Sequence, residues 1–429
     1  MITNSRKDKI FKLGEIFFSL GTFFLVSALP ISGIFFLFAI IISLIITGLK
    51  PFYDKWNYPL FLSMGMIIFS TINSSVFNIA AEVENIEKSN LWLSTINWIP
   101  LLISFWASQI YLKTNKQRIV FTKFLLAGSI PLILSCALQY WFKIFGPFDI
   151  LNGLIVWFQK PLINNDGISG LFSNQNYAGF WFAMLWPFSI YLLRQKNKKI
   201  QKLFLFTTSI IILYFGILTN SRNSFFGFLI SIPILFGIKN FFILFISIIF
   251  LLILYLFIMS NFPMEKSNLV TFIPVALIEK ITSFNFTNMA EMPRFEIWDK
   301  ALKLISQRPF WGWGASTFAV LYILRGGIYK IQHTHNIPLE LSYNFGIPVS
   351  LVLSGFIIFL IYNGWRYSSK NRFEKLSLNK HWLTSVTIVI FLQFNDITYY
   401  DGKISLIIWI LLSGLKCIID EQKLKTKTI

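Results

Sequence analysis

Long apolar stretches with few charged residues recur along the whole chain, and they predict its architecture. A helix needs about 20 mostly apolar residues to cross the hydrocarbon core of a bilayer. By this criterion, the sequence predicts membrane spans near residues 14–30, 31–49, 58–78, 91–112, 119–141, 175–193, 203–218, 222–238, 241–259, 341–363, 382–397 and 403–417. We therefore expect an all-α fold, a polytopic membrane helix bundle of about 12 transmembrane helices.

Two segments between these spans are long enough to hold structure of their own. The longer one, residues 260–340, is predicted to be a large, partly helical loop. Apolar residues recur in it at three- and four-residue intervals, which is typical of an amphipathic helix: Phe295, Trp298, Leu302 and Ile305. Pro309 is expected to end that helix. The shorter segment, residues 142–174, contains an amphipathic stretch from Leu151 to Phe158, a candidate for lying in the membrane interface.

Composition excludes the main classes of water-soluble protein. Of the 429 residues, 55% are hydrophobic and only 13% are charged, whereas a soluble domain carries about 25% charged residues. The mean hydropathy is +0.63. A soluble globule, a disordered chain and a disulfide-stapled secreted module are therefore all excluded.

The formal net charge of +19 is explained by the membrane, so no nucleic-acid partner is expected. With an inner N-terminus and alternating spans, 25 basic and 6 acidic residues lie on the inner side, and 13 of each lie outside. This asymmetry follows the positive-inside rule. The inner set includes Asp54, Arg118, Lys416, Asp420 and Glu421. Both termini are expected in the cytoplasm.

Polar residues gather at the outer ends of the predicted spans, whereas the middles of the spans hold almost no ionisable residue. These polar residues are Asn174, Asn176, Asn220, Arg222, Asn223, Glu340, Asn395, Asp396 and Asp401. Transporters and proton pumps hold charged groups near the bilayer midplane, because the ion must be bound there. The pattern therefore favours chemistry on a lipid-linked substrate at one membrane surface.

Arginines on the predicted outer side are candidate phosphate ligands. Arg222 opens the span 222–238 directly after Ser221, so a bidentate guanidinium and the free N–H groups of a helix N-terminus lie together. The alternative is an arginine that only reaches toward lipid headgroups, but orientation bias disfavours arginine on this side. Arg294 and Arg308 flank the helix predicted in the long loop. Each is either a second phosphate ligand or a solvated surface charge.

Two histidines, His333 and His335, precede the span 341–363, and they are the only histidines on the predicted outer side. A neutral imidazole accepts a proton from a hydroxyl group, so either residue is a candidate base. A hydrogen-bonded structural histidine is an equally weighted alternative. No metal site is expected, because no cysteine is near and only Glu340 is an obvious third ligand.

Two asparagines, Asn174 and Asn176, lie in the run from Gly170 to Ala178 that leads into the span 175–193. Asparagine caps a helix by accepting hydrogen bonds from its free N–H groups. The same side chains are also candidates for hydrogen bonding to a sugar or a diphosphate.

Taken together, these motifs resemble the O-antigen ligase and polymerase superfamily of bacterial membrane glycosyltransferases. Four motifs carry the resemblance, in the family's order: Gly170 to Ala178; Ser221-Arg222; Arg294, Trp298, Pro309, Gly312 and Gly314; and His335-Asn336, Glu340 and Gly346. They cover about residues 165–350. We therefore divide the chain into N-terminal transmembrane helices (1–165), a ligase/polymerase-like core with the periplasmic loop (166–363), and C-terminal transmembrane helices with a cytoplasmic tail (364–429).

The resemblance implies metal-independent, inverting transfer of a glycan from undecaprenyl diphosphate to a periplasmic acceptor, without a cofactor. The acceptor is a lipid A-core sugar in a ligase, which is the preferred interpretation, and a lipid-linked repeat unit in a polymerase. By position, His335 would be the base, and Arg222 and Arg294 would hold the diphosphate. The implied substrate-binding residues are Asn174, Asn176, Ser221, Asn336, Glu340 and Arg308. The implied location is the bacterial inner membrane, with the active site on the periplasmic side.

Two other functions stay open at this point. Some superfamily members in photosynthetic bacteria have been labelled bicarbonate transporters, although the missing midplane charges count against transport here. The other alternative is a non-catalytic scaffold of an envelope assembly complex. The roles of His333, Arg325, Asp396 and Asp401 also stay open. Asp396 is the strongest of these four, because an acid beside a histidine fixes its tautomer.

Overall fold

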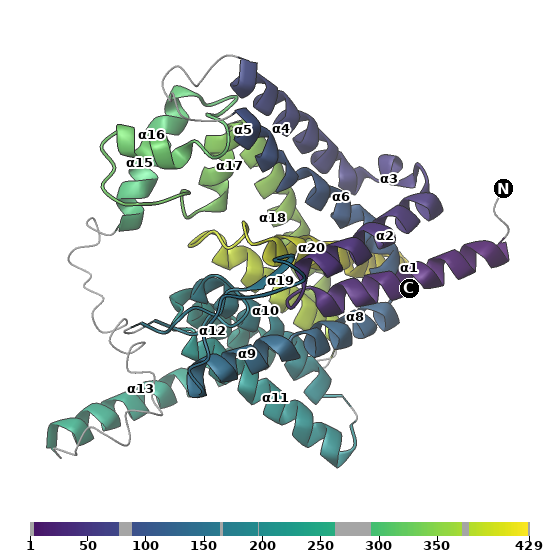
Figure 1. Ribbon diagram of the computed structural model, residues 1–429. Helices are drawn as coiled ribbons and strands as arrows, with labels where there is room; N and C mark the ends of the chain where they lie inside the picture. The colour runs from purple at the N-terminus through teal and green to yellow at the C-terminus, as the bar shows by residue number, and fades with distance from the viewer. Residues whose placement is uncertain are drawn as a thin grey trace. The chain divides into compact units, whose positions relative to one another are not determined.

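The computed structural model describes residues 4–76, 88–163, 166–195, 197–261, 293–370 and 377–427. Within these ranges the regular secondary structure is helical apart from one small β-hairpin, and turns and loops connect the elements (Figure 1). The chain forms two compact units. Unit 1 comprises Met1–Ser129, Phe286–Arg372 and Ile390–Ile429, and unit 2 comprises Ile130–Asn285 and Phe373–Val389. The three-part division expected from the motifs is a functional division, and it stays a prediction.

Unit 1 contains the first helices, those that follow the long loop, and the last helix. They are α1 (Asn4–Phe24), α2 (Leu29–Thr47), α3 (Lys50–Tyr53), the 3₁₀ helix η1 (Lys55–Asn57), α4 (Tyr58–Val76), α5 (Lys88–Ile96), α6 (Ile99–Ala107), α7 (Gln109–Leu112), α8 (Asn115–Gly128), α15 (Pro293–Gln307), α16 (Phe318–Leu324), α17 (Ile337–Phe345), α18 (Ile347–Lys370) and α20 (Gly402–Lys427).

Unit 2 contains the middle helices and the hairpin. They are α9 (Ile130–Trp141), β1 (Phe148–Ile150), β2 (Ile155–Trp157), α10 (Gln175–Leu193), α11 (Lys199–Leu218), α12 (Arg222–Phe236), α13 (Ile238–Asn261) and most of α19 (Leu378–Leu392). Helix α10 is buried along almost its whole length. Its sequence lacks an amphipathic stripe because other elements of the unit cover it on all sides.

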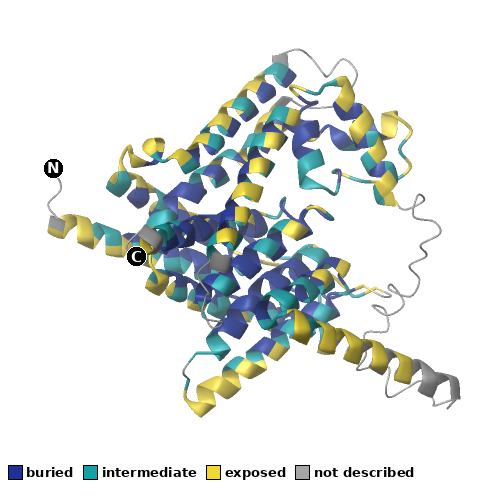
Figure 2. Ribbon diagram, turned by 180° about the vertical axis from the view of Figure 1, so that it is seen from behind, coloured by how far each residue is buried: buried dark blue, intermediate teal, exposed yellow. Residues whose placement is uncertain are grey.

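Five helical segments of the described chain are long and apolar enough to cross a membrane. They are Leu29–Thr47, Asn115–Trp141, Lys199–Leu218, Ile347–Tyr367 and Gly402–Lys425. The helical membrane architecture is thereby confirmed, whereas the number of twelve spans stays a prediction. Figure 2 shows long exposed stretches on α11 and α13. These exposed faces are apolar, with Leu203 66% and Ile246 63% exposed, as expected for helices that face lipid.

Some predicted spans are interrupted. The span predicted at 91–112 is three short helices, α5, α6 and α7, and Pro100 stands in the first turn of α6. Proline lacks the N–H that a continuous helix would need there, so this stretch is not one continuous helix. The span predicted at 341–363 is divided at Gly346, whose φ of 95° separates α17 from α18. This left-handed conformation is open to glycine at little cost.

The helix predicted in the long loop is α15, and it ends before Pro309 as expected. Of the residues in the predicted apolar stripe, Phe295 is 41% and Leu302 55% exposed. The residues that pack instead are Ile297, Ala301 and Leu304, with Ile305 as predicted; they meet α16 and α17. Trp298 is partly buried against the same core. Residues 262–292 of this loop lie outside the described residues.

One end of unit 1 holds a cluster of charged residues. Arg118 is fully buried; it pairs with Glu421 and donates to the Leu112 carbonyl at 2.9 Å. Lys416 pairs with Asp54 and Asp420, each at 2.7 Å. All five charged residues were assigned to the inner side from the charge count. Their mutual contacts show that they lie together, and the inner side stays a prediction.

In unit 2, Gly167 before α10 and Gly179 within α10 bring this part of the chain against the turn before α12. A Cβ added at Gly167 would lie 1.7 Å from the Thr219 carbonyl oxygen, and one added at Gly179 would lie 2.9 Å from the Ser221 Cβ. The Ile168 N–H donates to the Leu218 carbonyl at 3.1 Å. The N-termini of α10 and α12 therefore lie at the same end of the unit.

We expect Gly167→Ala to lower the free energy of unfolding by about 1–3 kcal/mol or more, because backbone atoms fill the space that the methyl group of the alanine needs. Thermal unfolding of the purified protein in detergent measures this. Gly65→Ala in α4 is the control, because nothing lies within 4 Å of a Cβ at that position. Equal melting temperatures for the two variants would contradict the close approach.

Candidate functional site

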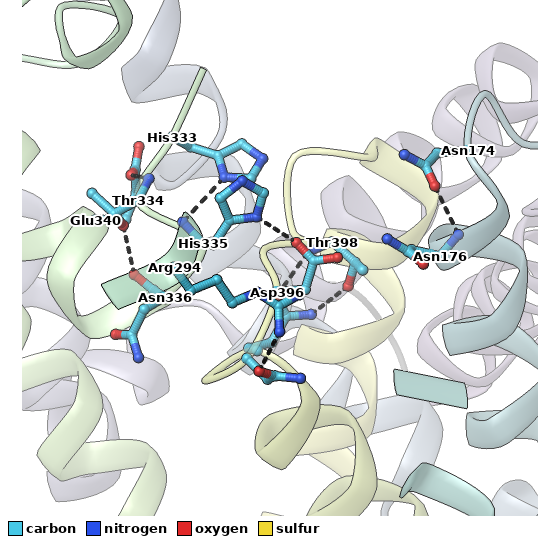
Figure 3. Close-up of polar contacts among 12 residues, drawn as sticks. Asn174, Asn176, Arg294, His333, Thr334, His335, Asn336, Glu340, Asp396 and Thr398 are labelled. Atoms are coloured by element: carbon cyan, nitrogen blue, oxygen red, sulfur yellow. Dashed lines mark hydrogen bonds and ion pairs between the residues drawn. The ribbon is translucent and has the colours of Figure 1, made fainter. Parts of the chain in front are cut away.

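The segment that carries His333 and His335 is fixed in unit 1 by contacts from three directions. From α15, the Trp298 indole N–H donates to the Thr334 carbonyl at 2.9 Å. From the turn after α19, the Gln393 carbonyl accepts the Ile337 N–H at 3.2 Å. From α17, the buried Glu340 carboxylate accepts the Thr334 N–H at 2.9 Å. The imidazoles therefore project from a well-supported backbone (Figure 3).

His335 and Asp396 form a hydrogen-bonded pair. The His335 Nδ1 and Asp396 Oδ1 atoms are 2.9 Å apart, and their side chains are 27% and 9% exposed. Burial alone would raise the pKa of the Asp396 carboxyl, but the hydrogen bond and charge of His335 and the charges of Arg294 and His333 lower this pKa overall. An ionised carboxylate only accepts hydrogen bonds, so Nδ1 carries the proton of this hydrogen bond, and in the neutral imidazole the lone pair lies on Nε2.

His335 adopts an unusual backbone conformation, with φ at 56°. For a residue other than glycine, this left-handed conformation is uncommon and costs energy. It is maintained by the hydrogen bonds of the neighbouring Thr334 and by the His335 N–H, which donates to the His333 Nδ1 at 3.3 Å. The conformation thus aims the imidazole at Asp396.

Arg294 joins the same cluster from the first turn of α15. Its Nη1 donates to the Asn395 side-chain oxygen at 2.6 Å, one residue before Asp396. Arg294 and Trp298 are four residues apart, so they share a face of α15 that looks toward the histidine segment. Figure 3 shows Arg294, His335 and Asp396 converging on one region. The arrangement places a permanent cation beside a candidate base.

Asn336 and Glu340 hold the site together from α17. Asn336 caps this helix by accepting the Leu339 N–H at 3.1 Å, and its amide donates to the Phe394 carbonyl at 2.9 Å. Glu340 also accepts hydrogen bonds from Asn344 at 3.0 Å and from the Tyr400 hydroxyl at 2.7 Å. Burial and the Glu340 charge raise the pKa of the Tyr400 phenol well above its usual value, so it stays a donor. These contacts tie α17 to the segment that carries Asp396.

His333 is packed against His335, with ring centroids 4.4 Å apart. Burial and the charge of His335 lower the pKa of His333, although Glu340 and Asp396 act in the opposite direction. Protonation of its Nδ1 would also remove the acceptor of the His335 N–H. The site therefore favours the neutral form of His333.

A pH dependence of stability follows from this lowered pKa. Below about pH 6.5 the unfolded chain binds a proton at His333 that the folded chain resists, so this contribution to stability falls as the pH falls. We expect His333→Gln to reduce the loss of melting temperature between about pH 7.5 and pH 5 relative to the unaltered protein. Scanning fluorimetry at both pH values measures this. A larger acid-induced loss in the variant would contradict it.

Unit 2 holds a second group of predicted site residues, at the N-termini of α10 and α12. Asn174 caps α10 by accepting the Asn176 N–H at 2.8 Å, as Figure 3 shows, so the capping interpretation is confirmed for this residue. Ser221 caps α12, where its hydroxyl accepts the Ser224 N–H at 3.4 Å. Arg222 is the first residue of α12 and its side chain is exposed. The guanidinium is accessible to an anion at a helix N-terminus.

The structure therefore groups the predicted residues in two sets. His335, Asn336, Glu340 and Arg294 lie together in unit 1, and Asn174, Asn176, Ser221 and Arg222 lie together in unit 2. Arg308 is in unit 1, and its guanidinium stacks 4.6 Å from the Trp313 ring centroid. Asp396 was only an open candidate in the sequence, since it is 61 residues from His335.

Comparison with protein families identifies a match in the second half of the chain. Residues 207–354 match a family model described as O-antigen ligase, and no curated protein sequence matches the chain. The match includes Arg222, Arg294 and His335, and it confirms over this range the resemblance seen in the motifs. It ends before Asp396 and begins after the turn that carries Asn174.

Proposed function

We propose that the chain, whose residues 207–354 match a family model described as O-antigen ligase, transfers a glycan from undecaprenyl diphosphate to an acceptor hydroxyl on the periplasmic side of the inner membrane. The transfer inverts the anomeric carbon and uses no metal ion. The observation that carries this proposal is the His335–Asp396 pair beside Arg294.

His335 is the proposed base. Its Nε2 accepts the proton of the acceptor hydroxyl as the oxygen attacks the anomeric carbon, and Asp396 stabilises the imidazolium that forms. Asp396 has a second effect, because its bond to Nδ1 keeps the lone pair on the nitrogen that faces the substrate. A positioned base of this kind contributes about 10²–10⁴-fold to the rate.

Arg222 and Arg294 are the proposed ligands of the diphosphate. Negative charge builds on the leaving group as the sugar–phosphate bond breaks, so fixed guanidinium groups act most strongly in the transition state. Inversion requires the base and the leaving group on opposite faces of the sugar. The proposal therefore requires Arg222 of unit 2 and His335 of unit 1 to act on one substrate. Asn174, Asn176, Ser221 and Arg308 are proposed to contact its glycan or diphosphate.

The length of α20 supports a periplasmic position for the histidine site. This helix begins at Gly402, next to the segment with Asp396 and Tyr400, and Glu421 in its last turns pairs with Arg118. The rise from Gly402 to Glu421 is about 28 Å, close to the roughly 30 Å hydrocarbon thickness of a bilayer. The site is thus proposed to face the membrane surface opposite the charged inner cluster.

An apolar cavity beside the histidine segment supports a lipid-linked donor. It has a volume of about 50 Å³, and its walls include Ile337, Phe394, Tyr399 and Trp409. Ile337 follows Asn336 directly, and Phe394 precedes the Arg294 partner Asn395. Hydrocarbon is the chemistry that such walls accept. We assign the cavity to part of the polyprenyl chain.

A reconstituted assay tests the proposal. The purified chain in proteoliposomes receives a polyprenyl-diphosphate-linked glycan, a chelator, and either lipid A-core acceptor or none. In the reaction with the acceptor, we expect glycan to be transferred to the lipid A core. In the reaction without it, we expect the polyprenyl-linked glycan to stay unchanged. Longer polyprenyl-linked glycans without the acceptor would identify a polymerase instead. Solute uptake without any glycan transfer would overturn the proposal in favour of transport.

A further inference from the structure

The β-hairpin of unit 2 presents large apolar side chains to the outside. Phe142, Phe148, Ile150, Leu151, Leu154 and Phe158 are all exposed, with Phe142 68% and Leu151 61% exposed. Surface hydrophobic residues are common when single, but a contiguous group of this kind marks an interaction site. The hairpin therefore has a partner that covers it.

The geometry of the hairpin concentrates these side chains. β1 and β2 are antiparallel, with Phe148 opposite Trp157 and Ile150 opposite Ile155. These four residues share one face of the ribbon, because directly paired residues and alternate residues point the same way. Leu151 and Leu154 extend the apolar surface at the turn, where Asn152 and Gly153 have positive φ values, as a tight hairpin turn requires.

Buried glutamines fasten the base of the hairpin to α9. The Gln139 amide donates to the Lys160 carbonyl at 2.7 Å, and its side-chain oxygen accepts the Ser169 and Gly170 N–H groups, each at 2.9 Å. Gln159 donates to the Ile144 carbonyl at 3.0 Å. The base of the hairpin is thus held by buried polar side chains, and within the hairpin Ile155 is buried while most of the other apolar residues are exposed together with Asp149 and Asn152.

The lipid bilayer is the partner that fits this surface. α9 ends at Trp141, which is also the end of the membrane-span candidate Asn115–Trp141, and β1 of the hairpin begins shortly after it, at Phe148. Tyr140 and Trp141 are the residue types that mark the membrane interface, and the Lys143 ammonium lies 5.3 Å from the Tyr140 ring centroid. Lys143 and Lys160 are both exposed beside the apolar residues and complement lipid phosphates.

We propose that the hairpin inserts into the interfacial region of the bilayer, with Leu151 and Leu154 among the acyl chains. Ser169 and Gly170 are bonded to Gln139, and the Gly170 carbonyl also accepts the Gln159 N–H at 3.1 Å. Through these hydrogen bonds, the inserted hairpin fixes how deep in the membrane interface the turn before Asn174 lies. This inference does not depend on the proposed glycan transfer.

Site-directed fluorescence tests the inference in nanodiscs that contain the full chain. Leu151→Cys and Leu154→Cys are each labelled with an environment-sensitive fluorophore; the two native cysteines are buried. Asp166→Cys, at an exposed polar position of the same unit, is the matched control. Each label is quenched either by lipids with a spin label near the headgroup or by iodide in the water.

We expect the spin-labelled lipid to quench the Leu151 and Leu154 labels at least about twice as strongly as the Asp166 label, with the order reversed for iodide. Equal iodide quenching at all three positions would place the hairpin in water and overturn the inference. Protection from both quenchers would also overturn it, because the hairpin would then be covered by a second copy or another protein. Two independent labelling positions guard against one variant that fails to fold.

Discussion

Replacing His335 by asparagine is expected to slow glycan transfer by about 10²–10⁴-fold, the usual contribution of a positioned base. Asparagine suits this test better than alanine, because it tolerates the positive φ of 56° at this position. The fold is therefore retained while the proton acceptor is lost. Initial rates in the reconstituted assay measure the effect.

Lys330→Ala is the matched control for this prediction, because Lys330 is exposed on the same loop. Its transfer rate is expected to stay within about twofold of the unaltered protein. Asp396→Asn adds a readout that a purely structural role would not change. This variant lacks the charge that stabilises the imidazolium. We therefore expect the pH dependence of the transfer rate to change, and the apparent KM to change less than the rate. Unchanged transfer by His335→Asn would remove the proposed base.

Replacing Arg222 by alanine is expected to lower the transfer rate by about 10²–10³-fold, the typical cost of one lost transition-state charge contact. Arg222→Lys is expected to recover part of this loss, because lysine keeps the charge but cannot form the bidentate fork to phosphate. Single-turnover rates with saturating lipid-linked donor separate this effect from weaker donor binding.

Lys239→Ala is the control for Arg222. Lys239 is likewise an exposed basic residue in the first turn of a helix of unit 2, here α13, but it belongs to the predicted inner side. Its replacement is expected to leave transfer unchanged. If both variants lost activity equally, the effect would be one of general charge or folding, and the diphosphate role of Arg222 would be wrong.

Hydropathy predicted the helical membrane fold well, because a span is a local property of about 20 residues. The start of α12 at Arg222 and the extent of α10 also agree with the predicted spans. Interruptions were harder to predict. Pro100 and Gly346 lie in apolar sequence, so a hydropathy window averages over them. The two residue types themselves could have indicated the breaks, because proline lacks an N–H and glycine adopts positive φ.

The candidate site was only partly predictable for a related reason. The motif around His335 identified the histidine, Asn336 and Glu340, since these residues lie within one turn and one helix. Asp396 is contributed by a different segment, and only its type, an acid on the predicted outer side, made it a candidate. The apolar stripe of α15 predicted the helix but not which of its residues pack in the core, since Phe295 and Leu302 are exposed whereas Ile297 and Ala301 are buried.

The contact between His335 and Asp396 has a practical consequence for fragments of this protein. The O-antigen ligase match ends at residue 354, whereas the carboxylate that orients the imidazole comes from residue 396. A fragment cut at the limits of that match, or a chimera that exchanges only those residues, would retain the histidine and lose the acid that selects its tautomer. Swapping experiments should therefore carry the stretch through Tyr400 together with the histidine segment.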